Sequence, residues 1–190
     1  MRVRKILYHG TTMLRLDMIK KDGLLRCNMP KSFEIEESFD INKGYVYLSS
    51  RLDEAIMYGL IKSLLDTRSD DLEKRMKSNP NYRDPVVLGI NAFKLGDNVE
   101  IDPQDPQTNP LLNEEFKTDQ YYKNSQWYRC KGDIKLKHLY KCKQIPFNVF
   151  GDDVINGFME STEKMYNESK SMMNTLASRP ILKQICRSML

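Results

Sequence analysis

The stretch Tyr8-His9-Gly10-Thr11-Thr12 decides how this chain is interpreted. Residues 4–9 alternate between polar and apolar side chains as a strand does, and apolar residues at helical spacing follow the stretch. A strand ending in His-Gly-Thr exposes an imidazole, a flexible backbone position and a hydroxyl together. Because glycine has no Cβ, a ligand can approach the backbone at Gly10, whose N–H and C=O suit a primary amide. We expect His9 to hydrogen-bond a hydroxyl of the same ligand.

A second informative stretch lies at 44–58 and contains Tyr45-Val46-Tyr47-Leu48-Ser49 and then Ala55-Ile56-Met57-Tyr58. The first part predicts a strand and the second a helix. Tyr47 and Tyr58 can then bring two aromatic rings together as a slot for a flat heterocycle, with stacking of about 0.5–1.5 kcal/mol per pair. Each motif alone is more typical of ordinary residues packed in a sheet or helix than of a binding site. Their order and spacing together favour a binding site.

These residues resemble the ADP-ribosyltransferase superfamily, in the diphtheria-toxin and PARP-like branch with its His-Tyr-Glu triad. The opening is also similar to rifampin ADP-ribosyltransferases and tRNA 2′-phosphotransferases, which share that fold. The resemblance covers residues 4–62 well and 86–145 loosely, whereas 150–190 match no family. It implies an ADP-ribosyltransferase-like fold and NAD as the co-substrate.

The resemblance also implies a role for each motif residue. His9 would hold a ribose, the Gly10 backbone would bind the carboxamide, and Thr11 would support the loop. Tyr47 and Tyr58 would sandwich the nicotinamide. Ser49 would help to seat its amide. No metal is implied.

Gln126 stands where the family has its catalytic glutamate, within Ser125-Gln126-Trp127. The carboxylate hydrogen-bonds the ribose 2′-hydroxyl and stabilises the positive charge that grows as nicotinamide leaves. Glutamine keeps the shape but loses the charge. Three interpretations stay open: a deliberately inactivated variant, which the isosteric exchange favours; a natural enzyme that uses glutamine or another group; or a carboxylate elsewhere, at Glu114, Glu115 or Asp119.

Length and composition bound the remaining possibilities. With 190 residues, 40% hydrophobic and 29% charged, the chain is typical of one soluble domain. We expect an α+β fold with a mixed, mostly antiparallel sheet and flanking helices. Residues 1–150 would form the catalytic domain and 151–190 a helical extension packed on it. No apolar run approaches a membrane span and no signal peptide is evident, so we expect a cytoplasmic protein without a membrane partner.

The cysteines and histidines give no metal-binding spacing. The four cysteines are scattered and the two histidines are too few to complete a zinc site with them. We expect reduced, unpaired thiols.

Sequence patterns predict the order of elements along the chain. Strands are expected at 4–9, 45–49, 86–93, 97–101, 121–130 and 139–145. Helices are expected from Thr11 or Thr12 to Gly23, at 51–67 with Ser50 as the cap, at 154–176 and after Pro180. The charged segment 68–84 is expected either to extend the preceding helix and then turn, or to form a solvated loop or lid, and 132–134 is expected to be a turn.

The acceptor of ADP-ribose is less defined. The stretch 117–143 is basic through seven lysines and Arg129, which favours nucleic acid slightly over protein as the acceptor. The aromatic residues interleaved with them, which could stack on unpaired bases, are Tyr121, Tyr122, Trp127 and Tyr128. Solvent-facing lysines on half-buried strands are the plainer interpretation. We expect a mono-ADP-ribosyltransferase acting as a bacterial or phage toxin or effector, in a toxin–antitoxin or phage-defence setting, with an antitoxin or chaperone as a further partner. The alternatives are an NAD-binding pseudoenzyme and a 2′-phosphotransferase, which would need phosphate-binding arginines where only Arg15 is evident.

Overall fold

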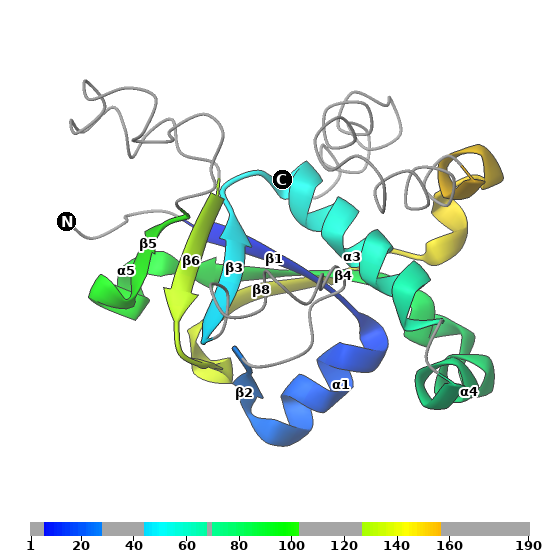
Figure 1. Cartoon of the computed structure of the whole chain (residues 1–190), viewed down its shortest axis with the longest axis horizontal. Helices are drawn as coiled ribbons and strands as arrows, with labels where there is room; N and C mark the ends of the chain where they lie inside the picture. Colours follow the sequence, from blue (N-terminus) through cyan, green and yellow to red (C-terminus); the bar gives the residue numbers. More distant parts are fainter. Residues whose placement is uncertain (1–5, 28–43, 68–69, 103–126, 157–190) are drawn as a thin grey trace, which may run out of the picture. The chain divides into compact units, whose positions relative to one another are not determined.

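The main sheet has six strands in the order β5-β6-β3-β1-β4-β8 (Figure 1). In this computed structural model, residues 6–27, 44–67, 70–102 and 127–156 are described. The strands are β1 (Ile6–Thr12), β3 (Tyr45–Ser49), β4 (Pro85–Asn91), β5 (Val99–Ile101), β6 (Trp127–Lys131) and β8 (Leu139–Gln144). The pairs β1–β3, β3–β6 and β5–β6 are antiparallel. The expected α+β class with a mostly antiparallel sheet is therefore confirmed.

Helices and a small second sheet complete the described fold. The second sheet pairs β2 (Leu24–Leu25) with β7 (Ile134–Lys135). The helices are α1 (Met13–Asp22), α3 (Leu52–Asp66), α4 (Asp70–Ser78) and α5 (Ala92–Leu95), with short 3-10 turns at Pro80–Arg83, Gly96–Asn98, Leu136–His138 and Phe147–Val149. No helix among the described residues is long and apolar enough to cross a membrane.

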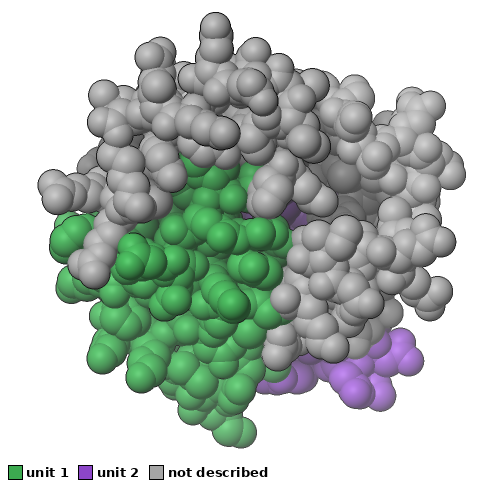
Figure 2. Space-filling model, turned by 60° about the vertical axis from the view of Figure 1, so that its left-hand side comes forward, with its two compact units in different colours: residues 1–9, 18–51, 88–141 green, residues 10–17, 52–87, 142–190 purple. Residues whose placement is uncertain are grey.

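The chain divides into two compact units, which Figure 2 shows in different colours. Residues 1–9, 18–51 and 88–141 form unit 1, and residues 10–17, 52–87 and 142–190 form unit 2. In unit 1 the buried side chains alternate along three neighbouring strands: Val46, Leu48, Val99, Ile101, Tyr128 and Cys130. Period-two burial of this kind leaves the other face of β3, β6 and β5 to polar and aromatic residues.

The interior of unit 2 is built around α3. Its buried apolar residues include Ala55, Ile56, Met57, Leu60, Ile61 and Leu64. Leu65 of the same helix is half-buried. The start of α1 is fixed by Thr12, whose Oγ1 accepts a hydrogen bond from the Arg15 N–H at 3.3 Å. Gly23, with φ of 70°, ends α1 in the left-handed conformation as expected.

Several boundaries differ from expectation. The described part of 68–84 forms α4 and a 3-10 turn at Pro80–Arg83, so the expectation of a loop is wrong and that of helix followed by a turn is closer. Strand β4 ends at Asn91, α5 begins at Ala92, and β5 starts only at Val99 after a 3-10 turn. Of the C-terminal helix, only its beginning within 152–156 is described. The remainder of the expected helix at 154–176, the expected helix after Pro180 and residues 121–126 of the expected strand lie outside the described residues.

Candidate functional site

A hydrogen bond within unit 1 joins His9 of the first motif to the strand of the second motif. His9 lies on β1 and its Nδ1 is 2.9 Å from the carbonyl oxygen of Tyr47 on β3. Because a carbonyl oxygen can only accept, Nδ1 carries the proton. In the neutral ring, Nε2 is then the acceptor nitrogen. This bond fixes both the orientation and the tautomer of His9 against the strand that carries Tyr47.

The Tyr47 phenol lies in a half-buried polar environment. Burial, and after it the charge of Asp102, raises the pKa of Tyr47 to about 12, against the opposing influence of Arg129. Asp102 is itself buried, with 5% of its surface exposed. Tyr47 is therefore a neutral hydroxyl at physiological pH, able to donate and to accept.

Arg129 is the centre of a polar row across three strands. It is the register partner of Tyr47 on β3 and of Glu100 on β5. Its Nε donates to Glu100 Oε1, and its guanidinium lies 4.2 Å from the ring centroid of Tyr45. Cation–π stacking and an ion pair thus hold one guanidinium beside Tyr47. We name Tyr45, Tyr47, Arg129 and Glu100 the sheet-face cluster.

Sequence reasoning missed this cluster as a unit, because Arg129 was grouped with surface lysines. The signal lay in the alternation: residues 45, 47 and 49 of one strand face 131, 129 and 127 of the next. Tyr128 was likewise expected to contribute to a nucleic-acid face. Its side chain is fully buried, so it is a core residue and that expectation is wrong.

Ser49 has a local structural task. It is buried, with 4% of its surface exposed, and its Oγ accepts a hydrogen bond from the Arg51 N–H at 2.9 Å. This shapes the chain between β3 and α3. A contribution of Ser49 to amide binding stays a prediction.

Gly10 packs against the backbone of α3 within unit 2. A Cβ added to Gly10 would lie 1.9 Å from the carbonyl oxygen of Ala55 and 2.7 Å from the nitrogen of Gly59. A Cβ on Gly59 would in turn meet the Thr11 carbonyl oxygen at 2.9 Å. The motif glycine is therefore required by close packing of strand and helix. Its role in binding a carboxamide through the backbone stays a prediction.

The remaining predicted residues are distributed as follows. Thr11 is buried in unit 2, and Tyr58 on α3 in the same unit has 36% of its surface exposed. Because Tyr47 belongs to unit 1, the sandwich of Tyr47 and Tyr58 stays a prediction. Gln126, and with it Glu114, Glu115 and Asp119, lies outside the described residues.

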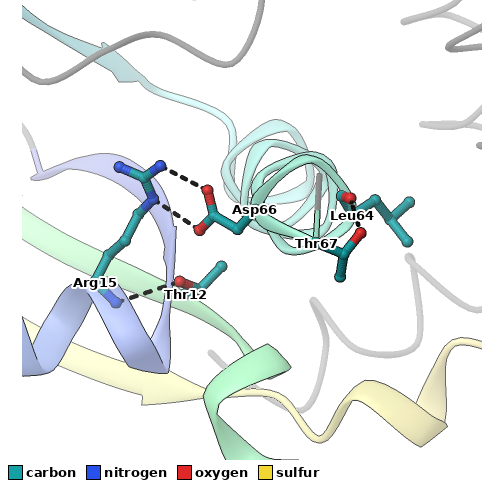
Figure 3. A network of polar contacts seen from close by, with 5 residues as sticks. All are labelled: Thr12, Arg15, Leu64, Asp66 and Thr67. Carbon is teal, nitrogen blue, oxygen red and sulfur yellow. Dashed lines mark hydrogen bonds and ion pairs between the residues drawn. The ribbon is translucent and has the colours of Figure 1, made fainter. Parts of the chain in front are cut away.

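Arg15 is committed to an internal ion pair in unit 2. Its Nε and Nη2 donate to the two carboxylate oxygens of Asp66 at 2.8 and 2.6 Å (Figure 3). Asp66 has 4% of its side chain exposed and Arg15 14%. The bidentate pair links the first turn of α1 to the last turn of α3, whose end is also bonded through Thr67 Oγ1 to the Leu64 carbonyl.

Among the described residues, no group of three or more His, Cys, Asp or Glu side chains could hold a metal ion. Cys27, Cys130 and Cys142 form no disulfide, and Cys186 lies outside the described residues. Burial raises the pKa of the Cys130 thiol to about 11, which makes it unreactive.

Comparison with known proteins adds little. No protein-family model and no curated protein matches the chain. Among solved structures, the chain is similar to protein CC0527 from Caulobacter crescentus, with a TM-score of 0.37 and 9% identity over 74% of this chain and 85% of that chain. A double mutant of the same protein gives a TM-score of 0.37 at 8% identity over the same shares. Similarity this weak supports no conclusion about fold family or activity.

Proposed function

We propose that this protein is a mono-ADP-ribosyltransferase that uses NAD. The observation that carries the proposal is the hydrogen bond between His9 Nδ1 and the Tyr47 carbonyl. It couples the histidine of the first motif to the tyrosine strand of the second, as a shared nucleotide site requires. The tautomer that it selects leaves Nε2 as an acceptor suited to a ribose hydroxyl.

In the proposed reaction the bond between nicotinamide and ribose C1′ breaks and its electron pair leaves with nicotinamide. The ribose acquires oxocarbenium character, and a nucleophile of the acceptor forms the new bond to C1′ and loses its proton. Tyr47 and Tyr58 would hold the nicotinamide ring and the Gly10 backbone its carboxamide. Tyr47, with its pKa raised to about 12, would stay neutral and contribute its ring and hydroxyl rather than a charge.

The acceptor class proposed here is a macromolecule, with nucleic acid preferred to protein. A toxin or effector role, an antitoxin partner and a cytoplasmic location belong to the same proposal. A 2′-phosphotransferase is the weaker alternative, because the Arg15 guanidinium is bound bidentately by Asp66. A pseudoenzyme that binds NAD without cleaving it is favoured by one observation, the uncharged Gln126 at the expected place of the catalytic acid.

Substitutions at His9 separate ligand binding from folding. In His9→Asn the side-chain amide can still donate to the Tyr47 carbonyl, but no atom replaces Nε2. We expect this variant to lose less melting temperature than His9→Ala and to bind NAD about 2- to 12-fold more weakly, as the loss of one hydrogen bond predicts. His9→Ala loses both contacts, so it should lower the melting temperature and weaken NAD binding.

Tyr47 supplies the matched comparison in the same calorimetric titration with NAD. Tyr47→Phe keeps the ring and should retain most of the affinity, whereas Tyr47→Ala loses the stacking and should weaken binding about 2- to 12-fold. Nicotinamide release is measured on the same samples. The proposed site would be contradicted if the native protein did not bind NAD. It would also be contradicted if His9→Asn and Tyr47→Ala both bound NAD as tightly as the native protein.

A further inference from the structure

Unit 1 carries a group of positive charges that neither the core nor the proposed NAD site uses. Lys94 on α5, Lys135 on β7 and Lys137 in the 3-10 turn at Leu136–His138 are all exposed. Of the described residues, no carboxylate forms an ion pair with any of these three. We name them the lysine cluster. Gathering like charges without a counter-ion is unfavourable until an anion neutralises them.

Sheet register brings the lysine cluster together from distant parts of the sequence. A Cβ on Gly89 of β4 would lie 3.5 Å from the Cβ of Lys141 on β8. The Ile145 N–H donates to the Pro85 carbonyl at 2.8 Å, so β4 and β8 run antiparallel. The chain that follows β4 therefore lies beside the chain that precedes β8. This places α5, with Lys94, next to the turn that carries Lys137.

The pKa of His138 is sensitive to the charges of all three lysines of the cluster. Burial and then the charges of Lys137, Lys135 and Lys94 lower the pKa of His138. Its Nδ1 is buried and has no hydrogen-bond partner among the described residues. The imidazole is thus neutral at pH 7, and the positive charge of the surface comes from the lysines.

The backbone that carries the cluster is held firmly. Leu136 N–H donates to the carbonyl of Gly23 at 2.9 Å, and Lys135 is the register partner of Leu24. A surface fixed in this way loses little conformational freedom when it binds a ligand. Tyr140, two residues after His138 and on β8, is open to solvent, with 70% of its surface exposed.

We propose that the lysine cluster and Tyr140 form a binding surface for single-stranded nucleic acid. The lysines would contact successive phosphates, and an unpaired base would stack on the Tyr140 ring. Lysines on an edge strand commonly prevent pairing with other chains, which accounts for Lys141 on β8. That task does not account for the lysine cluster, whose members lie outside the six-stranded sheet.

The position of the surface indicates a polymer rather than a nucleotide. Ile6 of β1 lies beside Gly89, at 3.6 Å from its added Cβ, so Ile6, Gly89 and Lys141 form one row across three strands. Met13 N–H donates to the Asp84 carbonyl, so β1 also runs antiparallel to β4 and therefore parallel to β8. His9 and His138 then lie on opposite sides of this row, about 20 Å apart. Naming this polymer as the ADP-ribose acceptor rests on the proposed function.

The experiment measures binding without NAD, by fluorescence anisotropy of a labelled single-stranded RNA of about 12 nucleotides, a common site size. The test variant is Lys94→Gln/Lys135→Gln/Lys137→Gln. The control, Lys20→Gln/Lys21→Gln/Lys74→Gln, changes the net charge equally at exposed positions elsewhere. Loss of three phosphate contacts should reduce the salt slope of log K by about 2 and weaken binding about 50-fold at 0.15 M salt. The control should change affinity by less than about threefold.

Tyr140 variants and heparin distinguish nucleic acid from other polyanions. Tyr140→Ala should weaken RNA binding about 5- to 150-fold and leave heparin, which has no bases, unaffected; Tyr140→Phe should retain RNA binding. RNA should also raise the pKa of His138 in an NMR titration, assigned with His138→Gln, because bound phosphates offset the lysine charges.

Equal losses in the test and control triples would overturn the proposal, since net charge alone would then explain binding. Equal effects of Tyr140→Ala on RNA and heparin, or none on either, would overturn it in favour of a general anion surface. Because the assay contains no NAD, these results leave the transferase proposal standing. A chain that binds RNA but never cleaves NAD would contradict only the proposed function.

Discussion

Substituting Gly10 by alanine should destabilise the protein strongly because of the contact between Gly10 and α3. The added Cβ would lie 1.9 Å from the Ala55 carbonyl oxygen, whereas an ordinary contact begins at 3.4 Å. The opposing atoms belong to the helix backbone, so no change of rotamer relieves the overlap. The strand or the helix would have to move by roughly 1.5 Å in a close-packed interior.

Overpacking of a core costs about 1–3 kcal/mol, and backbone atoms as the obstacle put Gly10→Ala near 3 kcal/mol. For a chain of this length, 1 kcal/mol corresponds to about 2–4 °C in melting temperature, so we expect a decrease of about 6–12 °C. Gly89→Ala is the matched control. Its Cβ would meet Lys141 and Ile6 at 3.5 and 3.6 Å, which are ordinary contacts, and neither glycine has a positive φ.

Thermal unfolding followed by circular dichroism, with urea unfolding at 25 °C as a second measurement, gives both values. Gly89→Ala should melt within about 2 °C of the native protein, because alanine also restricts the unfolded chain. A Gly10→Ala variant that melts as the native protein does would refute the strand–helix contact. If that stable variant also failed to bind NAD, Gly10 would act through its ligand and not through packing.

Three further predictions concern charge and reactivity. Arg15→Met should lower the free energy of unfolding in urea by about 3–5 kcal/mol, because it leaves the Asp66 carboxylate buried and unpaired. Arg15→Met/Asp66→Leu should recover part of that loss, and a double variant no more stable than Arg15→Met would show that the pair is not coupled. Because the pKa of Tyr47 is raised to about 12 from about 10 in the unfolded chain, its stabilising contribution is complete below pH 10 and disappears as the pH rises from about 10 to 12. Spectrophotometric titration should therefore show that Tyr47→Phe lacks a tyrosine that ionises near pH 12, and the loss of one with an ordinary pKa would contradict this. Peptide mass spectrometry should find that iodoacetamide modifies the exposed Cys142 long before Cys130, whose surface is 2% exposed; equal rates would mean that Cys130 is accessible.

Local patterns predicted the elements next to the motifs well. The strand at Tyr45–Ser49 and the helix at Leu52–Asp66 follow from short-range periodicity and agree with expectation closely. In α4, high charge left a helix and a loop as competing interpretations. The acidic first turn, the basic last turn and the Glu73–Lys77 pair at 2.8 Å are helix signals, and Met76 is the one described residue that this helix buries.

Long-range contacts could not be obtained from the same patterns. A glycine after a histidine suits both a ligand and a close helix, and only the packing of α3 on Gly10 distinguishes them. In the sequence, nothing distinguishes the structural role of Arg129 from that of the nearby lysines. Its pairing with Glu100 and stacking on Tyr45 depend on the register of three strands that are distant along the chain.

The most direct measurement of the central claim is transfer of labelled ADP-ribose from NAD to RNA, DNA and protein in separate reactions, with the native chain compared with Gln126→Glu. The label is carried on the adenylate half of NAD, and nicotinamide release is followed in parallel. We expect one acceptor pool to be labelled, with a sharp rise when glutamate restores the negative charge that stabilises the transition state. If neither form labels any acceptor and neither releases nicotinamide, the transferase proposal is contradicted and the chain is left as a binding protein.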